Sequence, residues 1–196
     1  MSAAEVGWLA GVVLAGGASR RMGSDKAWLD VEGEPLWRRQ VKVLRDAGAE
    51  PVLVARRRDQ ADLGDEDVWQ VRDRVADAGP MAGIEAAMRA VKNPFLAVLA
   101  VDMPVVTAEW FKWLAEHCGG AMGVVAARAE GTEPLAAIYP RGALATVTQR
   151  LEGGERSMRA LVSELVAGGL VRLVPVPPAW ERQLTNWNRP ADRGGP

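Results

Sequence analysis

The chain has 196 residues, and its 24 Lys and Arg nearly balance its 25 Asp and Glu, which leaves a formal net charge of −1 at pH 7. A chain this close to neutral lacks the broad positive field that draws proteins to nucleic acids or anionic membranes, so neither is expected as a partner. One cysteine, Cys118, excludes an intrachain disulfide and a thiolate metal cluster. With one histidine, His117, any metal is expected to be held by carboxylates.

The length is typical of one domain with a sizeable core, and we expect this domain to span residues 5–190. Residues 191–196 include two glycines and a proline and are expected to form a loose tail. The sequence shows no charged-then-apolar leader and no apolar run of about 18 residues. We therefore expect a cytoplasmic protein.

Strand-like and helix-like segments alternate from the beginning of the chain, which is typical of an α/β fold around a mostly parallel sheet. Runs of apolar and β-branched residues predict strands at residues 8–14, 51–55, 68–71 and 95–101. Apolar residues at helical spacing predict helices at residues 35–47, 81–91, 108–118 and 158–167. The wholly apolar run at 95–101 is expected to be a central strand that is buried on both faces.

Three further strands are predicted in the second half of the chain, at residues 124–127, 135–139 and 170–174. The first two leave no room for a helix between them, so we expect some antiparallel strands late in the sheet. The predicted fold class is α/β, with a mostly parallel central sheet between two layers of helices.

The most informative segment is residues 11–26, GVVLAGGASRRMGSDK, where an apolar strand leads into a glycine-rich turn with three cations. Its glycines permit close backbone approach to an anion, and Arg20, Arg21 and Lys26 supply positive charge. The spacing is neither that of a P-loop nor the G-x-G-x-x-G of dinucleotide-binding folds. The segment therefore predicts a polyphosphate site of another kind.

Two more polar groups follow predicted strands, at Arg72-Asp73 with the glycine-rich turn 78–83, and at Asp102. Ligands of open α/β sheets bind at the carboxyl ends of the strands, so we expect these groups to meet the first loop there. A carboxylate after six apolar residues is costly to desolvate unless a cation meets it, and Mg²⁺ is the hard cation that bridges carboxylates to phosphates. Asp102 is accordingly the predicted Mg²⁺ ligand.

Residues 14–26 match the pattern LAGG-x-S-x-RMG-x-DK and resemble the signature loop of the molybdenum cofactor guanylyltransferases, the MobA-like NTP transferase family. The resemblance extends along most of the chain, through the segments 29–36, 133–135, 154–157 and the ending TNWNRP at 185–190. It implies a three-layer, Rossmann-like nucleotidyltransferase fold. It also implies transfer of GMP from GTP to the phosphate of a molybdenum-pterin, with release of pyrophosphate and with Mg²⁺ as cofactor.

The resemblance further implies roles for individual residues. The nucleotide-binding residues would be Leu14, Ala15, Gly16, Gly17, Lys26, Asp73, Gly79, Pro80, Gly83 and Asp102. The catalytic residues would be Lys26, Asp102 and the pair Arg20 and Arg21, one of which is expected to steady the leaving pyrophosphate. The pterin-binding residues would be Glu133, Arg156, Asn186 and Asn188. Besides its substrates, such a protein is expected to contact other proteins of molybdenum cofactor biosynthesis, or acceptors of the cofactor, transiently.

Alternatives remain open at this point. The family often places an asparagine after the second strand, and here Ala55 stands at that position, followed by three arginines at 56–58. Gly17 and the GPMAG turn favour guanine over cytosine, but a cytidylyltransferase or a regulatory nucleotide-binding domain without turnover is also compatible with the sequence. The three arginines are interpreted as a solvated run, because no aromatic ladder accompanies them.

Overall fold

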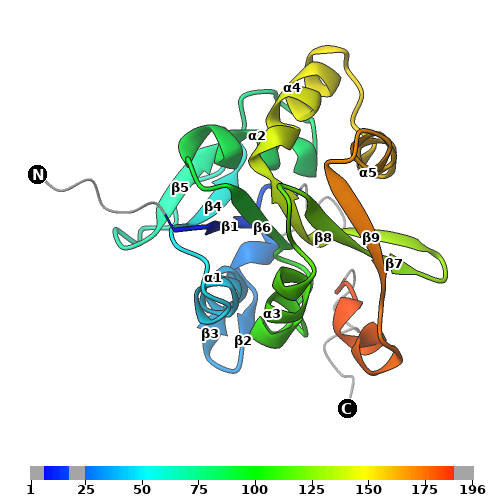
Figure 1. Cartoon of the computed structure of the whole chain (residues 1–196). Coiled ribbons are helices and arrows are strands. Elements are labelled where there is room, and N and C mark those ends of the chain that lie inside the picture. Colours follow the sequence, from blue (N-terminus) through cyan, green and yellow to red (C-terminus); the bar gives the residue numbers. More distant parts are fainter. Residues whose placement is uncertain (1–6, 18–24, 188–196) are drawn as a thin grey trace, which may run out of the picture.

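The computed structural model describes residues 7–17 and 25–187, and its centre is a seven-stranded sheet (Figure 1). In chain order the strands are β1 (Leu9–Leu14), β4 (Val52–Arg56), β5 (Trp69–Arg72), β6 (Phe95–Ala100), β7 (Gly123–Arg128), β8 (Gly131–Pro140) and β9 (Val171–Pro175). In space their order is β5-β4-β1-β6-β8-β7-β9. Among the strands described in this seven-stranded sheet, only β8 runs antiparallel to its neighbours, so the expectation of late antiparallel pairing is confirmed for one strand.

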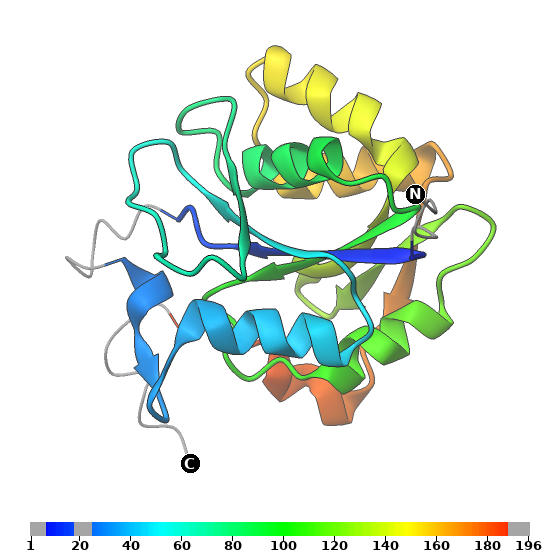
Figure 2. The same ribbon diagram turned by 90° about the vertical axis from the view of Figure 1, so that its left-hand side faces the viewer.

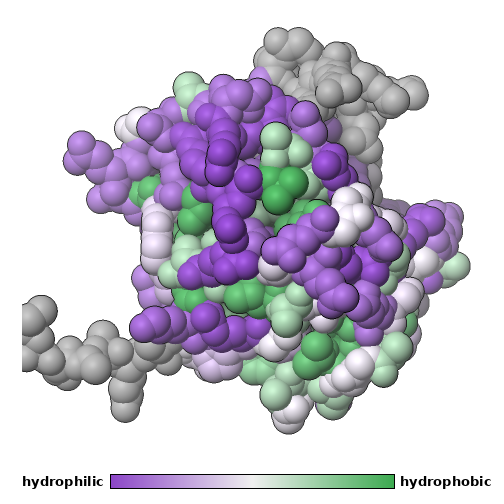
Figure 3. All heavy atoms as spheres, turned by 90° about the horizontal axis from the view of Figure 1, so that it is seen from above, coloured by the Kyte–Doolittle hydropathy of each residue, from purple (hydrophilic) through white to green (hydrophobic). Residues whose placement is uncertain are grey.

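Helices cover both faces of the sheet, as Figure 2 shows. One layer contains α2 (Pro80–Ala90), α4 (Leu144–Glu152) and α5 (Met158–Ala167). The other contains α1 (Leu36–Asp46), α3 (Ala108–Glu116) and the 3-10 segment η3 (Pro178–Leu184). Strand β1 serves both layers, because Leu9 and Val13 pack on the α1 and α3 side while Ala10 and Val12 pack on the α2 side. Seen from the α4 side, the surface is mostly hydrophilic, with small apolar areas (Figure 3).

Several elements differ from the sequence-based expectations. A small hairpin of β2 (Asp30–Val31) and β3 (Glu34–Pro35) precedes α1, and the short 3-10 helix η1 (Lys26–Trp28) follows the glycine-rich loop. Helix α4, reached through the 3-10 turn η2 (Arg141–Ala143), was not predicted. Val147 and Leu151 of this helix are buried, and Leu144 packs against the same core. Strand β8 also begins at Gly131, four residues before the predicted strand at 135–139.

The strand order reverses direction at β1, and this reversal opens a crevice where a ligand can bind. From β1 the chain passes outward through β4 to β5, then crosses back over α2 to β6 on the other side of β1. Leu14 is in register with Ala55 on one neighbour and with Ala100 on the other, so the carboxyl ends of these strands meet at one edge. Such a switch point leaves a crevice at the carboxyl edge of the sheet.

Among the described residues, no helix is long and apolar enough to span a bilayer.

Candidate functional site

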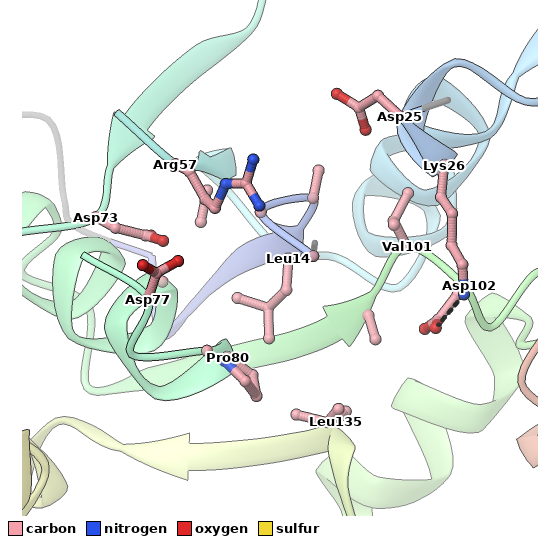
Figure 4. A pocket seen from close by; sticks show the side chains of 17 residues that line it. Leu14, Asp25, Lys26, Arg57, Asp73, Asp77, Pro80, Val101, Asp102 and Leu135 are labelled. Atoms are coloured by element: carbon pink, nitrogen blue, oxygen red, sulfur yellow. Dashed lines mark hydrogen bonds and ion pairs between the residues drawn. The ribbon is translucent and has the colours of Figure 1, made fainter. Parts of the chain in front are cut away.

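A cavity of about 390 Å³ opens at this edge of the sheet (Figure 4). All ten predicted nucleotide-binding residues line it: Leu14, Ala15, Gly16, Gly17, Lys26, Asp73, Gly79, Pro80, Gly83 and Asp102. The structure adds seven residues: Asp25, Ala55, Arg57, Asp77, Ala100, Val101 and Leu135. Strand ends from three parts of the chain therefore converge on one space, as their shared edge requires.

Lys26 and Asp102 form an ion pair on one side of the cavity. The Lys26 Nζ atom lies 3.2 Å from Asp102 Oδ2, and both side chains are partly exposed (Figure 4). A third residue completes this cluster, because Lys26 Nζ donates to the carbonyl of Trp187 over 2.9 Å and the Trp187 N–H donates to the carbonyl of Asp102 over 2.8 Å. The segment after η3 therefore lies against both predicted catalytic groups.

The end of the glycine-rich loop is fixed by a polar network that the sequence did not reveal. Asp25 caps η1 by accepting from the Ala27 N–H over 3.1 Å, and its other oxygen lies 3.1 Å from Arg56 Nη2. Gln60 Nε2 donates to the same Asp25 oxygen over 3.1 Å and to the Ala15 carbonyl over 3.3 Å. Two ends of the first loop are thereby tied to the segment after β4.

The interpretation of residues 56–58 as a solvated run is wrong for Arg56, whose side chain is 1% exposed. Burial lowers the pKa of Arg56, and the neighbouring Asp25 carboxylate opposes that effect. Arg57 lies in the cavity wall, where its guanidinium pairs with Asp59 over 3.0 Å. The burial of Arg56 follows from tertiary packing, because Arg56 is the last residue of β4 and is buried like the rest of that strand.

The opposite side of the cavity is formed by Asp73 and the beginning of α2. The pKa of Asp73 is raised to about 6, chiefly by burial, and the nearby Arg57 and Arg72 limit the increase. Gly83 lets α2 approach the sheet, since a Cβ there would lie 2.9 Å from Leu14 Cδ2 and 3.0 Å from Ala55 Cβ. Gly79 precedes the helix with φ of +67°, a conformation that favours glycine, and Pro80 occupies the first helical turn.

The comparison with known proteins agrees with this geometry. The family model described as the MobA-like NTP transferase domain matches residues 11–168, which is most of the chain. The chain belongs to the MobA-like NTP transferase family. It is 51% identical over 188 residues to a probable molybdenum cofactor guanylyltransferase of Opitutus terrae, a match that covers 94% of this chain and 93% of that protein. A molybdenum cofactor guanylyltransferase of Pseudomonas putida is 31% identical over 183 residues, or 91% of this chain and 92% of that protein.

Solved structures share the fold. The molybdopterin-guanine dinucleotide biosynthesis protein A of Archaeoglobus fulgidus superposes with a TM-score of 0.72 at 23% identity, covering 93% of this chain and 94% of that chain. A nucleotidyl transferase from Methanothermobacter superposes with a TM-score of 0.77 at 21% identity, covering 94% of both chains. The three-layer nucleotidyltransferase fold that the sequence predicted is confirmed.

Of the residues expected to bind the pterin in this MobA-like chain, the structure describes Glu133, Arg156 and Asn186. Glu133 on β8 is buried, and burial raises its pKa. It lies 3.6 Å from Arg128 Nη1 and near enough to Asp102 for that carboxylate to contribute to the increase. Arg156 lies on the Asp73 side of the cavity, where its Nη1 donates to the carbonyl of Asp77. Asn186 is exposed beside Trp187, close to the Lys26 and Asp102 pair.

Some predicted residues of the MobA-like site, namely Arg20, Arg21, Asn188 and the expected tail at 191–196, lie outside the described residues. Sequence reasoning missed Asp25, Gln60 and Asp77, each of which is an ordinary polar residue in a loop. Asp25 had one available signal, because an aspartate directly before Lys26 is a typical helix N-cap. The other two carry no local pattern that distinguishes them from surface residues.

Proposed function

We propose that this protein transfers GMP from GTP to the phosphate of a molybdenum-pterin and releases pyrophosphate. The observation that carries this proposal is the meeting, in one cavity, of the strand-to-glycine loop after β1 with the Lys26 and Asp102 pair. The names of the relatives support the choice of substrates, since the matching Opitutus and Pseudomonas proteins are both called molybdenum cofactor guanylyltransferases.

In this proposal a phosphate oxygen of the acceptor attacks the α-phosphorus of GTP. A new phosphoanhydride bond forms as the bond from the α-phosphorus to the bridging oxygen breaks, and the electron pair leaves with pyrophosphate. An acceptor phosphate is already a nucleophile, so the protein needs no general base. Its main task is to align two polyanions and to offset negative charge at the α-phosphate.

The chain's residues have distinct parts in that task. The backbone N–H groups at Gly16 and Gly17, which line the cavity, would face the triphosphate together with the Lys26 ammonium. In the structure, the Lys26 ammonium lies beside Asp102 and donates to the Trp187 carbonyl. Its charge is therefore located at the edge of the cavity where the two substrates would meet. Arg20 or Arg21 would steady the leaving pyrophosphate. Asn186, next to Trp187, would contact the acceptor, because its amide can both donate and accept hydrogen bonds.

A divalent cation is part of the proposal, with Asp102 as its protein ligand. Within the described residues no group of three or more His, Cys, Asp or Glu side chains could hold a metal. Asp102 as one carboxylate ligand nevertheless agrees with Mg²⁺, which is commonly bound by one or two carboxylates together with substrate phosphates. When bound, the cation would supply Lewis-acid polarisation of the phosphate oxygens.

The decisive test is calorimetric titration of the purified protein with GTP, CTP, ATP and UTP in the presence of Mg²⁺. We expect GTP to bind most tightly, and Asp102→Asn to weaken that binding, while Asp46→Asn serves as a charge-matched control on the exposed end of α1. Preference for CTP would favour the cytidylyltransferase alternative. Absence of nucleotide binding would refute the proposal.

Turnover separates the enzyme from a regulatory nucleotide-binding domain. Pyrophosphate release should require GTP and a molybdenum-pterin together, and GTP binding without release in the presence of the pterin would favour the regulatory alternative. Delivery of the pterin by other proteins of the pathway, and a cytoplasmic location, also belong to this proposal. Copurification from the cytoplasmic fraction with a pterin-carrying protein would support both.

A further inference from the structure

The loop between β5 and α2 places two carboxylates on the side of the cavity opposite Lys26 and Asp102. Asp73 and Asp77 both line the cavity, and Figure 4 shows both carboxylates directed into it. Asp73 is only 6% exposed, whereas Asp77 lies at the exposed rim. Neither carboxylate makes a hydrogen bond or an ion pair with another described residue. Two acceptor groups are thus available to a ligand in the cavity.

The two carboxylates differ in what lies beside them. Asp73 is next to the first loop, because a Cβ on Gly16 would lie 3.4 Å from Asp73 Oδ2. A nucleotide whose phosphates follow that loop would therefore meet Asp73 near its sugar. Asp77 comes two residues before Gly79, which lines the cavity together with Pro80. The base, which lies beyond the sugar, would reach Asp77.

The backbone at Asp77 is held in place from another part of the chain. Asp77 has φ of +52°, which is uncommon for a residue with a side chain, and its carbonyl accepts a hydrogen bond from Arg156 Nη1. The corner that carries Arg156 is itself fixed, because the largely buried Arg150 pairs with Glu155 and with Glu164 on α5. Arg156 therefore connects the α4–α5 loop, which these ion pairs hold in place, to the rim of the cavity.

We propose that Asp77 is a specificity-determining residue that reads the Watson–Crick edge of guanine, and that Arg156 is the positioning residue that holds it there. This inference rests on the proposed function, in which GTP occupies the cavity. A carboxylate offers two acceptors and no donor, and the guanine N1–H and 2-amino group offer two adjacent donors. Adenine and cytosine place a ring acceptor next to their amino group, and uracil has one N–H between two carbonyls. Each of these bases would bring a lone pair against the carboxylate, so the same contact that selects guanine rejects them.

The test compares the affinities of GTP and ITP, since inosine keeps the N1–H and lacks the 2-amino group. Calorimetry is carried out on the full chain with Mg²⁺, for the wild type, Asp77→Asn, Arg156→Ala and Arg156→Lys. Asparagine tolerates a positive φ, so Asp77→Asn keeps the backbone and removes one acceptor. Asp46→Asn is the control for loss of one negative charge, and thermal unfolding checks that each variant is folded.

We expect the wild type to bind GTP about tenfold or more tightly than ITP, as loss of a hydrogen bond to a charged group predicts. Asp77→Asn should bring the two affinities within about twofold of each other, mainly by weakening GTP. Arg156→Ala should reduce the ratio in the same direction, Arg156→Lys should restore part of it, and Arg156→Ala should add nothing in the Asp77→Asn background.

Three outcomes would overturn the inference, and they are distinguishable. A wild-type ratio of GTP to ITP affinity in a folded Asp77→Asn variant would remove Asp77 from base recognition while leaving the proposed function intact. An unchanged ratio together with altered discrimination against 2′-deoxy-GTP would assign Asp77 to the sugar instead. Preference of the wild type for CTP, or no nucleotide binding, would refute the proposed function and this inference with it.

Discussion

The backbone N–H of Trp187 donates to the carbonyl oxygen of Asp102 over 2.8 Å, which joins the last described segment of the chain to the end of the central strand β6. The same residue accepts from the Lys26 ammonium through its carbonyl. The chain just before this segment is anchored by η3, because Trp180 packs against Trp110 and Trp113 of α3. The ring centroids are 5.9 and 6.1 Å from that of Trp180. Main-chain groups of Trp187 therefore contact the Lys26 ammonium and the main chain of Asp102.

This contact predicts that the backbone of Trp187 matters more than its side chain. Trp187→Pro removes the N–H that donates to the backbone carbonyl of Asp102. We expect kcat for pyrophosphate release to fall about five- to tenfold, which is the effect of one lost hydrogen bond. Trp187→Ala keeps both backbone groups and is the matched control. Equal losses in the two variants would show that the indole, not the main chain, is responsible.

The buried carboxylate of Asp73 predicts a dependence of stability on pH. Its pKa of about 6 in the folded protein lies above the ordinary value of 3.8, so the folded state binds the proton more tightly than the unfolded state. The contribution of Asp73 to stability is therefore full below about pH 4 and is lost as the pH rises through 6. We expect Asp73→Asn to stabilise the protein by about 2 kcal/mol at pH 7.5, with little effect at pH 4.

Urea unfolding of both proteins at pH 4, 5, 6 and 7.5 measures this difference. A constant difference between the two proteins over this range would mean that Asp73 does not titrate between pH 4 and 6 in the folded state.

The close approach of α2 to the sheet predicts a steric cost at Gly83. A methyl group there would lie 2.9 Å from Leu14 Cδ2 and 3.0 Å from Ala55 Cβ, so Gly83→Ala should destabilise the protein by about 1–3 kcal/mol. The affinity for GTP should also fall, since the displaced atoms belong to the cavity wall. Gly119→Ala is the control, because a Cβ at Gly119 meets no atom within 4 Å. Unchanged unfolding and binding in Gly83→Ala would mean that α2 shifts freely.

The Arg56 and Asp25 pair predicts an asymmetry between single and double variants. Removing the Asp25 carboxylate leaves a buried guanidinium whose Nε and Nη1 atoms already lack partners in the described structure. We expect Asp25→Asn to lower the free energy of unfolding by about 2–3 kcal/mol. Arg56→Met combined with Asp25→Asn should recover part of that loss, and additive effects in urea unfolding would contradict this coupling.

The sequence predicted many of the residues that line the cavity, because the signals for them are local. A strand followed at once by glycines, or by Asp102, places those residues at a strand end whatever the rest of the chain does. The alternation of apolar segments predicted a mostly parallel sheet with helices on both faces, but the order of the strands comes from the structure alone. All ten predicted nucleotide-binding residues consequently line one cavity.

What the sequence did not predict depends on contacts between distant segments. The sequence around Arg56 is that of a surface arginine, and its burial depends on the contact with Asp25. The hydrogen bond from Arg156 to the carbonyl of Asp77 likewise has no local signal in the sequence. In each case the deciding partner lies far away in sequence.

The central position of β1 and β6 has a consequence for how such a protein can diversify. Lys26 follows β1 and Asp102 follows β6, and these strands are hydrogen-bonded neighbours in register from Leu9 with Phe95 to Leu14 with Ala100. The outer strands β5 and β9 can change, lengthen or carry new loops without altering the spacing between the lysine and the aspartate. Under the proposed function, changes of base or acceptor at the margins of the sheet would leave the position of the phosphate-binding pair unaltered.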